Sequence, residues 1–127
     1  MFCTIHDDIR YLGVDFDPQV VRDLRSRDKS IVYGDIEDPD LLEHLPFKSA
    51  SCIISTVPES AFSLQLYETL QRHDFKGRVF LTALLEKDFE LLAGTGHKDI
   101  IMPHKMAAEY FYDYLINNVL KDNAGKK

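Results

Sequence analysis

Polar side chains close three of the apolar runs in this 127-residue sequence, at the points where strands are expected to end. Asp15 follows the first run, Asp35 follows the second, and Ser55 and Thr56 end the third. In an open sheet of parallel strands, ligands bind beyond the carboxyl ends of the strands. We therefore expect these side chains to lie along one edge of a sheet, where they would form a ligand site.

The residue types at this edge suit a nucleotide. The carboxylate of Asp15 can accept both hydroxyl hydrogens of an adenosine ribose and would repel a 2′-phosphate, which favours NAD or an adenine mononucleotide over NADP. Gly34 permits a close backbone approach, and Asp35 can accept from an exocyclic adenine amine. Phe16 and Ile36, which directly follow the two aspartates, complete this part of the predicted cofactor site.

Ser55 and Thr56 have a different role in this interpretation. They precede an expected helix, so their hydroxyls and the helix dipole would face phosphate or ribose oxygens. Each candidate also has a plain structural alternative. Asp15 and Asp35 can serve only as turn residues, and the two hydroxyls can cap backbone groups.

Catalytic and metal-binding signals are weak. The sequence contains neither a Gly-x-Ser-x-Gly elbow nor a P-loop, and Ser55 has no evident general base, so no catalytic residue and no enzyme activity are expected. His6-Asp7-Asp8 has metal-compatible atoms, but three adjacent residues seldom point at one ion, and a solvated turn is expected there instead of a metal site.

The elements that would position these residues alternate along the chain. Four short apolar runs, each followed by a segment of helical periodicity, and a shorter fifth run predict an α/β fold with a mostly parallel sheet. The runs are residues 11–14, 31–33, 52–56, 79–82 and 100–102, and Cys52 is expected to be a small core residue. Helix starts are predicted at Asp17-Pro18, at Asp38-Pro39 and at Ser60, with a further helix over 86–93 ended by Gly94 and Gly96.

The last predicted helix, over residues 105–120, carries apolar side chains on more than one face. A helix packed on one sheet needs only one apolar stripe. Two interpretations remain open at this point. The helix is either well buried with a few exposed tyrosines, or it packs at a subunit interface.

The composition of the chain disfavours several classes of function. Fifteen Lys and Arg against 21 Asp and Glu give a net charge of -6, which disfavours nucleic acid and anionic lipid as partners. No apolar stretch approaches the ~20 residues that cross a bilayer, so no direct membrane insertion is expected. Two cysteines suggest neither a disulfide framework nor a thiolate metal site, and a cytoplasmic location fits.

The ordered series of motifs resembles one family. GVDFDP at 13–18, VYGD at 32–35 with DPDLL at 38–42, IISTVP at 53–58 and IIMPH at 100–104 look like the RCK or KTN regulatory domain, of TrkA-N type, of potassium channels and transporters. The resemblance runs from about residue 11 to 118. It implies that Asp15 meets ribose, Asp35 meets adenine, and Ser55 and Thr56 meet the phosphate or second-ribose region.

The resemblance also implies partners. It predicts a homodimer formed through the C-terminal helix, with contacts from Tyr110, Phe111, Tyr114 and Leu115, and association with a membrane transporter or channel subunit. The dimer agrees with the apolar character of that helix on several faces.

The chain departs from this family at its start. The family begins with a strand, a Gly-x-Gly-x-x-Gly turn and a helix, whereas only residues 1–10 precede the first strong run here. We therefore expect a three-layer Rossmann-like fold that lacks the usual first strand, glycine-rich loop and first helix. Residues 1–10 would be a remnant or a replacement strand, residues 11–120 the nucleotide-binding domain, and residues 121–127 a disordered tail.

A functional expectation follows from these observations. The chain is predicted to be a regulatory nucleotide-sensing domain of a potassium or other cation transport system, which binds NAD(H), ATP, ADP or AMP weakly or not at all in this short form. A dimerisation scaffold that has lost ligand binding is the alternative. An NAD-dependent dehydrogenase fragment is a third, although no acid–base partner or substrate domain is visible.

Overall fold

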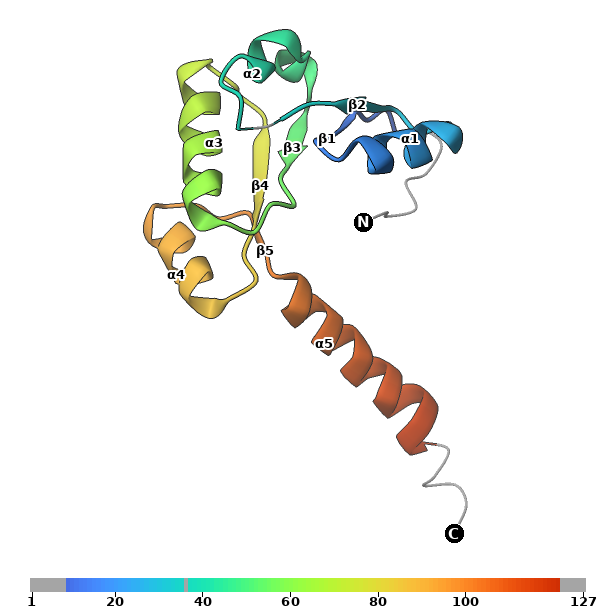
Figure 1. Cartoon of the computed structure of the whole chain (residues 1–127). Coiled ribbons are helices and arrows are strands. Elements are labelled where there is room, and N and C mark those ends of the chain that lie inside the picture. Colours follow the sequence, from blue (N-terminus) through green and yellow to red (C-terminus); the bar gives the residue numbers. More distant parts are fainter. Residues whose placement is uncertain (1–8, 36, 122–127) are drawn as a thin grey trace. The chain divides into compact units, whose positions relative to one another are not determined.

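The computed structural model describes residues 9–35 and 37–121, and its strands alternate with helices along the chain (Figure 1). The N-terminal remnant predicted for residues 1–10 and the tail predicted for residues 121–127 lie almost wholly outside the described residues, and the predicted cofactor contact Ile36 lies outside them as well. Contacts divide the chain into two compact units, residues 1–46 and residues 47–127.

Unit 1 contains two strands that pair in parallel. Its elements are β1 (Gly13–Asp15), α1 (Pro18–Ser26), β2 (Ile31–Tyr33) and the single turn α2 (Leu41–His44). In the register of the pair, Gly13 lies opposite Ile31 and Asp15 lies opposite Tyr33. Val21 and Leu24 of α1 pack with Ile31 of β2 to form the core of this unit.

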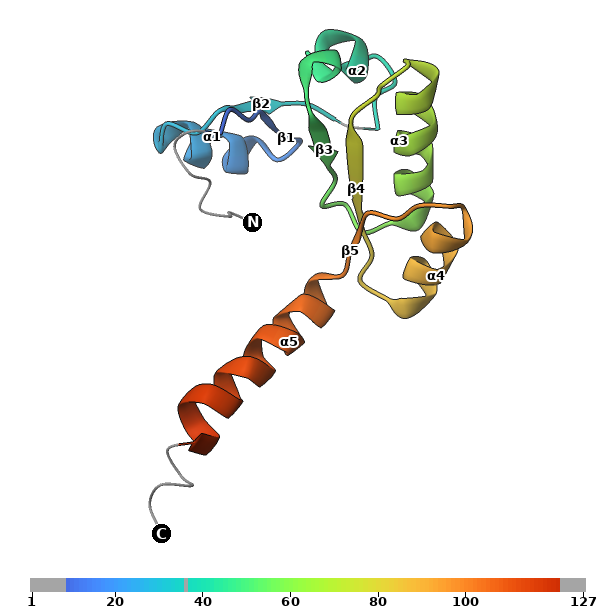
Figure 2. The same ribbon diagram turned by 180° about the vertical axis from the view of Figure 1, so that it is seen from behind.

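Unit 2 contains three parallel strands in the order β3-β4-β5. Its elements are η1 (Phe47–Ser49), β3 (Cys52–Ile54), α3 (Ser60–Arg72), β4 (Arg78–Thr82), α4 (Glu86–Gly94), β5 (Ile100–Ile101), α5 (Pro103–Tyr114) and η2 (Leu115–Leu120). Figures 1 and 2 show α3 and α4 on the same side of this sheet. The buried apolar side chains of this unit are Phe47, Phe62, Leu70, Val79, Leu81, Ala83 and Leu92.

The predicted fold class is confirmed, because every observed strand pairing is parallel and helices separate the strands. Each predicted run overlaps its strand, although β1 extends to Asp15 and β4 already begins at Arg78. The first helix also begins as the sequence indicates: the Asp17 carboxylate accepts a hydrogen bond of 2.9 Å from the backbone N–H of Gln19, and Pro18 opens the helix. A proline costs nothing there, because N–H groups in the first turn have no partner within the helix.

Some local predictions were wrong in detail. Helix α3 starts at Ser60 itself, with Glu59 and not Ser60 in the capping position. Helix α2 is limited to one turn, because Leu45 adopts an extended conformation immediately before Pro46. Cys52 is exposed and is not a core residue, since it opens the outermost strand of its sheet.

The C-terminal helix consists of two consecutive helical elements, α5 and η2. Helix α5 starts at Pro103, two residues before its predicted start, and continues from Leu115 as the π-helix η2. No residue of either element is buried. Within residues 9–35 and 37–121, no helix combines the length and the apolar character needed to cross a membrane.

Candidate functional site

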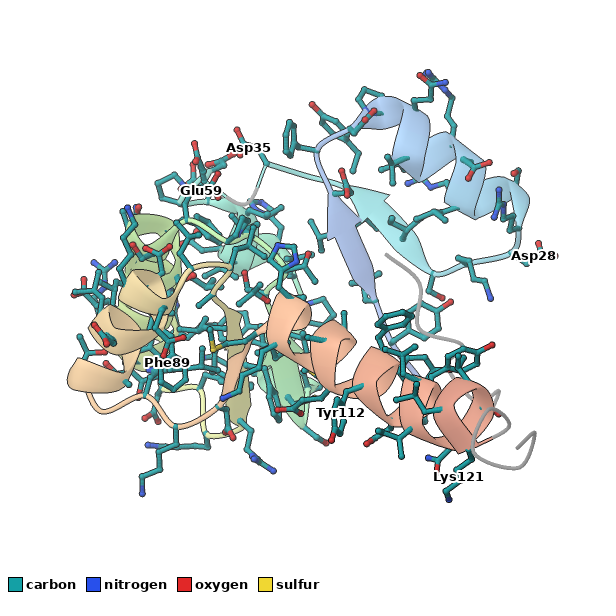
Figure 3. The ribbon with its side chains drawn as sticks, turned by 90° about the horizontal axis from the view of Figure 1, so that it is seen from below. Asp28, Asp35, Glu59, Phe89, Tyr112 and Lys121 are labelled. Carbon is teal, nitrogen blue, oxygen red and sulfur yellow. The ribbon has the colours of Figure 1, made fainter. Side chains whose placement is uncertain are left out.

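Asp15 and Asp35 lie at the carboxyl ends of neighbouring parallel strands. Asp15 is the last residue of β1, and its carbonyl oxygen accepts a hydrogen bond of 3.0 Å from the N–H of Gly34, just beyond β2. Asp35 is the next residue, where the chain leaves the strand (Figure 3). The structure therefore brings two of the predicted nucleotide contacts to one edge of the unit 1 sheet.

Each of these aspartates also shapes its own turn. Oδ1 of Asp15 accepts from the N–H of Asp17 at 2.8 Å, and Oδ1 of Asp35 accepts from the N–H of Glu37 at 3.0 Å. Both are Asx-turns, which present the carboxylate at a fixed angle to the chain. Among the described residues only one oxygen of each carboxylate is engaged in this way, so a second acceptor remains on each for a ligand hydroxyl or amine.

Close packing explains why a glycine, Gly34, stands between β2 and Asp35. A Cβ on Gly34 would lie 2.7 Å from a methyl carbon of Leu41 and 3.3 Å from one of Val14, so no larger residue fits without moving the side chain of Leu41. Phe16, beside Asp15, is 67% exposed and presents an aromatic face to solvent next to the carboxylate. This edge thus combines two carboxylates with one exposed ring.

Ser55 and Thr56 belong to unit 2, at the carboxyl end of β3. Ser55 is only 6% exposed, and two hydrogen bonds join its backbone to β4. Its N–H donates to the carbonyl oxygen of Phe80 at 2.9 Å, and its own carbonyl oxygen accepts from the hydroxyl of Thr82 at 2.7 Å. Its Oγ accepts a long hydrogen bond of 3.4 Å from Val57. Thr56 is exposed. The capping role foreseen as the alternative for Ser55 is therefore present.

The first turn of α3 follows these residues. Glu59 provides no side-chain cap, so the N–H groups of this turn have no partner from the capping residue. One turn further on, Ser63 is 0% exposed, and its hydroxyl has no hydrogen-bond partner among the described residues. The sequence analysis did not single out Ser63, because nothing in its neighbours distinguishes a serine on the buried face of the helix.

An ion pair and a buried histidine lie elsewhere in unit 2. Arg78 and Asp99 form a paired contact, with N–O distances of 3.1 and 2.6 Å, and the hydrogen bond from Arg78 lowers the pKa of Asp99. His97 is buried with its ring edge against Tyr67, at a centroid distance of 4.0 Å. Burial lowers the pKa of His97, although the nearby carboxylate of Asp99 acts in the opposite direction.

His97 follows the end of α4 and is enclosed where α4 and α3 meet. No group of three or more His, Cys, Asp or Glu residues in the described part of the chain could hold a metal ion. The carboxylate edge of unit 1 and the start of α3 in unit 2 both offer polar groups to a ligand.

Comparisons with known proteins agree with this picture. Curated proteins give no match to the chain. Among solved structures, the NAD(P)-binding domain of an exopolyphosphatase-related protein from Archaeoglobus fulgidus is similar, with a TM-score of 0.66 and 17% identity over 82% of this chain and 77% of that one. At this identity the likeness shows the fold, which is that of a Rossmann-like NAD(P)-binding domain. The family model of the TrkA-N domain matches residues 4–103, most of the chain, and the protein therefore belongs to the TrkA-N domain family.

Proposed function

We propose that this chain is a regulatory nucleotide-sensing domain of a potassium or other cation transport system. The observation that carries the proposal is the pair of carboxylates, Asp15 and Asp35, at the ends of adjacent parallel strands in a domain of the TrkA-N family. Each keeps an oxygen for a ligand after serving its own turn. The ligand is NAD(H) or an adenine mononucleotide, because a carboxylate at Asp15 accepts ribose hydroxyls and repels a 2′-phosphate.

Binding to this chain is weak. The sequence contains no Gly-x-Gly-x-x-Gly, and such a turn supplies the backbone N–H groups that hold a pyrophosphate. The remaining contacts are hydrogen bonds that the ligand donates to the carboxylates of the half-buried Asp15 and the exposed Asp35, each contributing about 1.5–3 kcal/mol at most. Sensing needs no chemical step, since a nucleotide biases the attached transporter through a difference in its affinity for two arrangements of the domain. The domain would therefore act without being an enzyme.

Calorimetry and NMR titration test this proposal with NADH, NAD⁺, ATP and AMP. We expect weak binding, with shifts at the amides of residues 15 and 35, and an affinity lowered about five- to tenfold by Asp15→Asn. Asn keeps an oxygen for the turn at Asp17 but removes the charge. Asp23→Asn is the matched control, because Asp23 is an exposed carboxylate of α1 paired with Arg27. Micromolar affinity would contradict the proposed weakness, and titration shifts that avoid residues 15 and 35 would contradict the site.

The partner assignment rests on α5. Tyr110, Phe111, Tyr112 and Tyr114 are all exposed, and Phe111 and Tyr114 stack on each other with ring centroids 6.5 Å apart. So many exposed aromatic side chains on one helix are typical of an interface. The homodimer would form through Tyr110, Phe111, Tyr114 and Leu115.

This same observation supports the second candidate function, a dimerisation scaffold that has lost ligand binding. Light scattering combined with the nucleotide titration separates the two candidates. A stable dimer that no nucleotide perturbs favours the scaffold, whereas a dimer whose melting temperature rises with nucleotide favours the sensor. Tyr110→Ser with Phe111→Ser should yield a monomer in either case. Uptake of rubidium ions by cells with and without the Asp15→Asn chain tests the transport assignment.

A further inference from the structure

An exposed tyrosine stands beside Asp15 at the carboxylate edge of unit 1. Tyr33 is the last residue of β2, and the register of the two strands places it opposite Asp15. Neighbouring strands lie about 4.8 Å apart, and paired residues direct their side chains to the same face of the sheet. Asp35, labelled in Figure 3, follows two residues later along the chain. Tyr33 thus neighbours one carboxylate across the sheet and the other along the chain.

The core of unit 1 leaves the ring of Tyr33 uncovered. Ile31, two residues earlier in β2, lies on the same face of the sheet and is buried with Val21 and Leu24 of α1. Tyr33 itself is 58% exposed, so α1 covers the start of β2 and not its end. A single exposed aromatic residue is ordinary on a protein surface. What distinguishes Tyr33 is its place, because a paired strand holds it at the edge where the ligand carboxylates lie.

A nucleotide offers its site more than polar groups. Carboxylates accept from ribose hydroxyls and from the adenine amine, whereas the two faces of the purine ring pack on aromatic side chains. Phe16 and Tyr33 are both exposed near this edge. Phe16 lies in a bend beyond β1, where no strand pairing fixes it, while Tyr33 is held by the register of β1 and β2. The fixed ring is the better stacking surface, because it loses less conformational freedom when a ligand binds.

We propose that Tyr33 is the stacking surface for the purine base of the nucleotide that the carboxylate edge binds. This inference rests on the proposed function and adds to it a contact that selects nucleotides over ribose phosphates without a base. The aromatic ring makes the contact and the phenolic hydroxyl does not, so phenylalanine at this position preserves it. A ligand that has the ribose and the phosphate but no base gains nothing from Tyr33.

NMR titration of the full chain with AMP and with ribose 5-phosphate tests this contact. In the unmodified chain we expect nuclear Overhauser effects between the adenine protons of AMP and the ring protons of Tyr33. Tyr33→Ser should weaken AMP binding about tenfold, and Tyr33→Phe should change it by less than about twofold. Neither change should alter the shifts that ribose 5-phosphate causes. Tyr11→Ser is the matched control, because Tyr11 is an exposed tyrosine that precedes β1, at the opposite end of that strand.

The proposal is overturned if Tyr33→Ser binds AMP as tightly as the unmodified chain, if Tyr33→Phe binds as weakly as Tyr33→Ser, or if Phe16→Ser alone weakens binding. It is also overturned if AMP shifts the amides of residues 15 and 35 without Overhauser effects to Tyr33, a result that stands even where a variant fails to fold. Each of these outcomes leaves the proposed function intact, since AMP still binds at the carboxylates. AMP that shifts neither amide overturns the proposed function and this inference together.

Discussion

Replacing Ser63 by alanine should make the protein more stable, which is unusual for a change at a fully buried position. The Ser63 hydroxyl is 0% exposed and has no hydrogen-bond partner among the described residues. A buried hydroxyl left without a partner costs about 1–3 kcal/mol of folding free energy. Alanine removes that cost and gains up to about 0.5 kcal/mol of helix propensity, while the loss of one oxygen leaves only a small gap. We expect a net stabilisation of about 1–2 kcal/mol.

Urea denaturation followed by circular dichroism measures this change, because α3 belongs to the cooperative core of unit 2 and the chain has no tryptophan. Ser60→Ala is the matched control: Ser60 opens the same helix and is half-buried, so its free energy of unfolding should change by less than about 0.5 kcal/mol. A destabilisation of Ser63→Ala by about 1 kcal/mol or more would refute the reasoning, since it would mean that the hydroxyl makes a hydrogen bond in solution.

Four further substitutions test unit 2 by the same assay. Leu81→Ala should destabilise by about 3–5 kcal/mol, because Leu81 is 0% exposed in the central strand, whereas Leu85→Ala, at 54% exposure, should cost less than about 1 kcal/mol. Gly77→Ala should destabilise by about 1–3 kcal/mol, because its Cβ would lie 2.6 Å from the carbonyl oxygen of Ser51. Burial lowers the pKa of His97 in the folded chain, so the unfolded chain binds the proton more readily, and stability should fall as the pH drops below the ordinary histidine value of 6.5. His97→Gln should reduce the difference between unfolding midpoints measured at pH 7.5 and at pH 5.5 (about one unit either side of that value), and an unchanged difference would contradict the assignment.

Local sequence signals were sufficient for most of the elements. Each apolar run overlaps the strand that it predicted to within one residue at the strand ends, because strands of a parallel sheet are mostly apolar. The start of α1 was predicted from Asp17 and Pro18 alone, since the cap is made by residues that are neighbours in the sequence. The turn roles of Asp15 and Asp35 are local in the same way, as each bonds to an N–H two residues ahead.

Features that depend on distant parts of the chain were not predictable. Arg78 and Asp99 are 21 residues apart and meet only because β4 and β5 are neighbours. His97 is buried by Tyr67 of another helix, so its neighbours in the sequence say nothing of its environment. Cys52 lies in an apolar run, yet it is exposed, because β3 is the outermost strand of its sheet. The position of a strand within a sheet cannot be predicted from the residues of that strand alone.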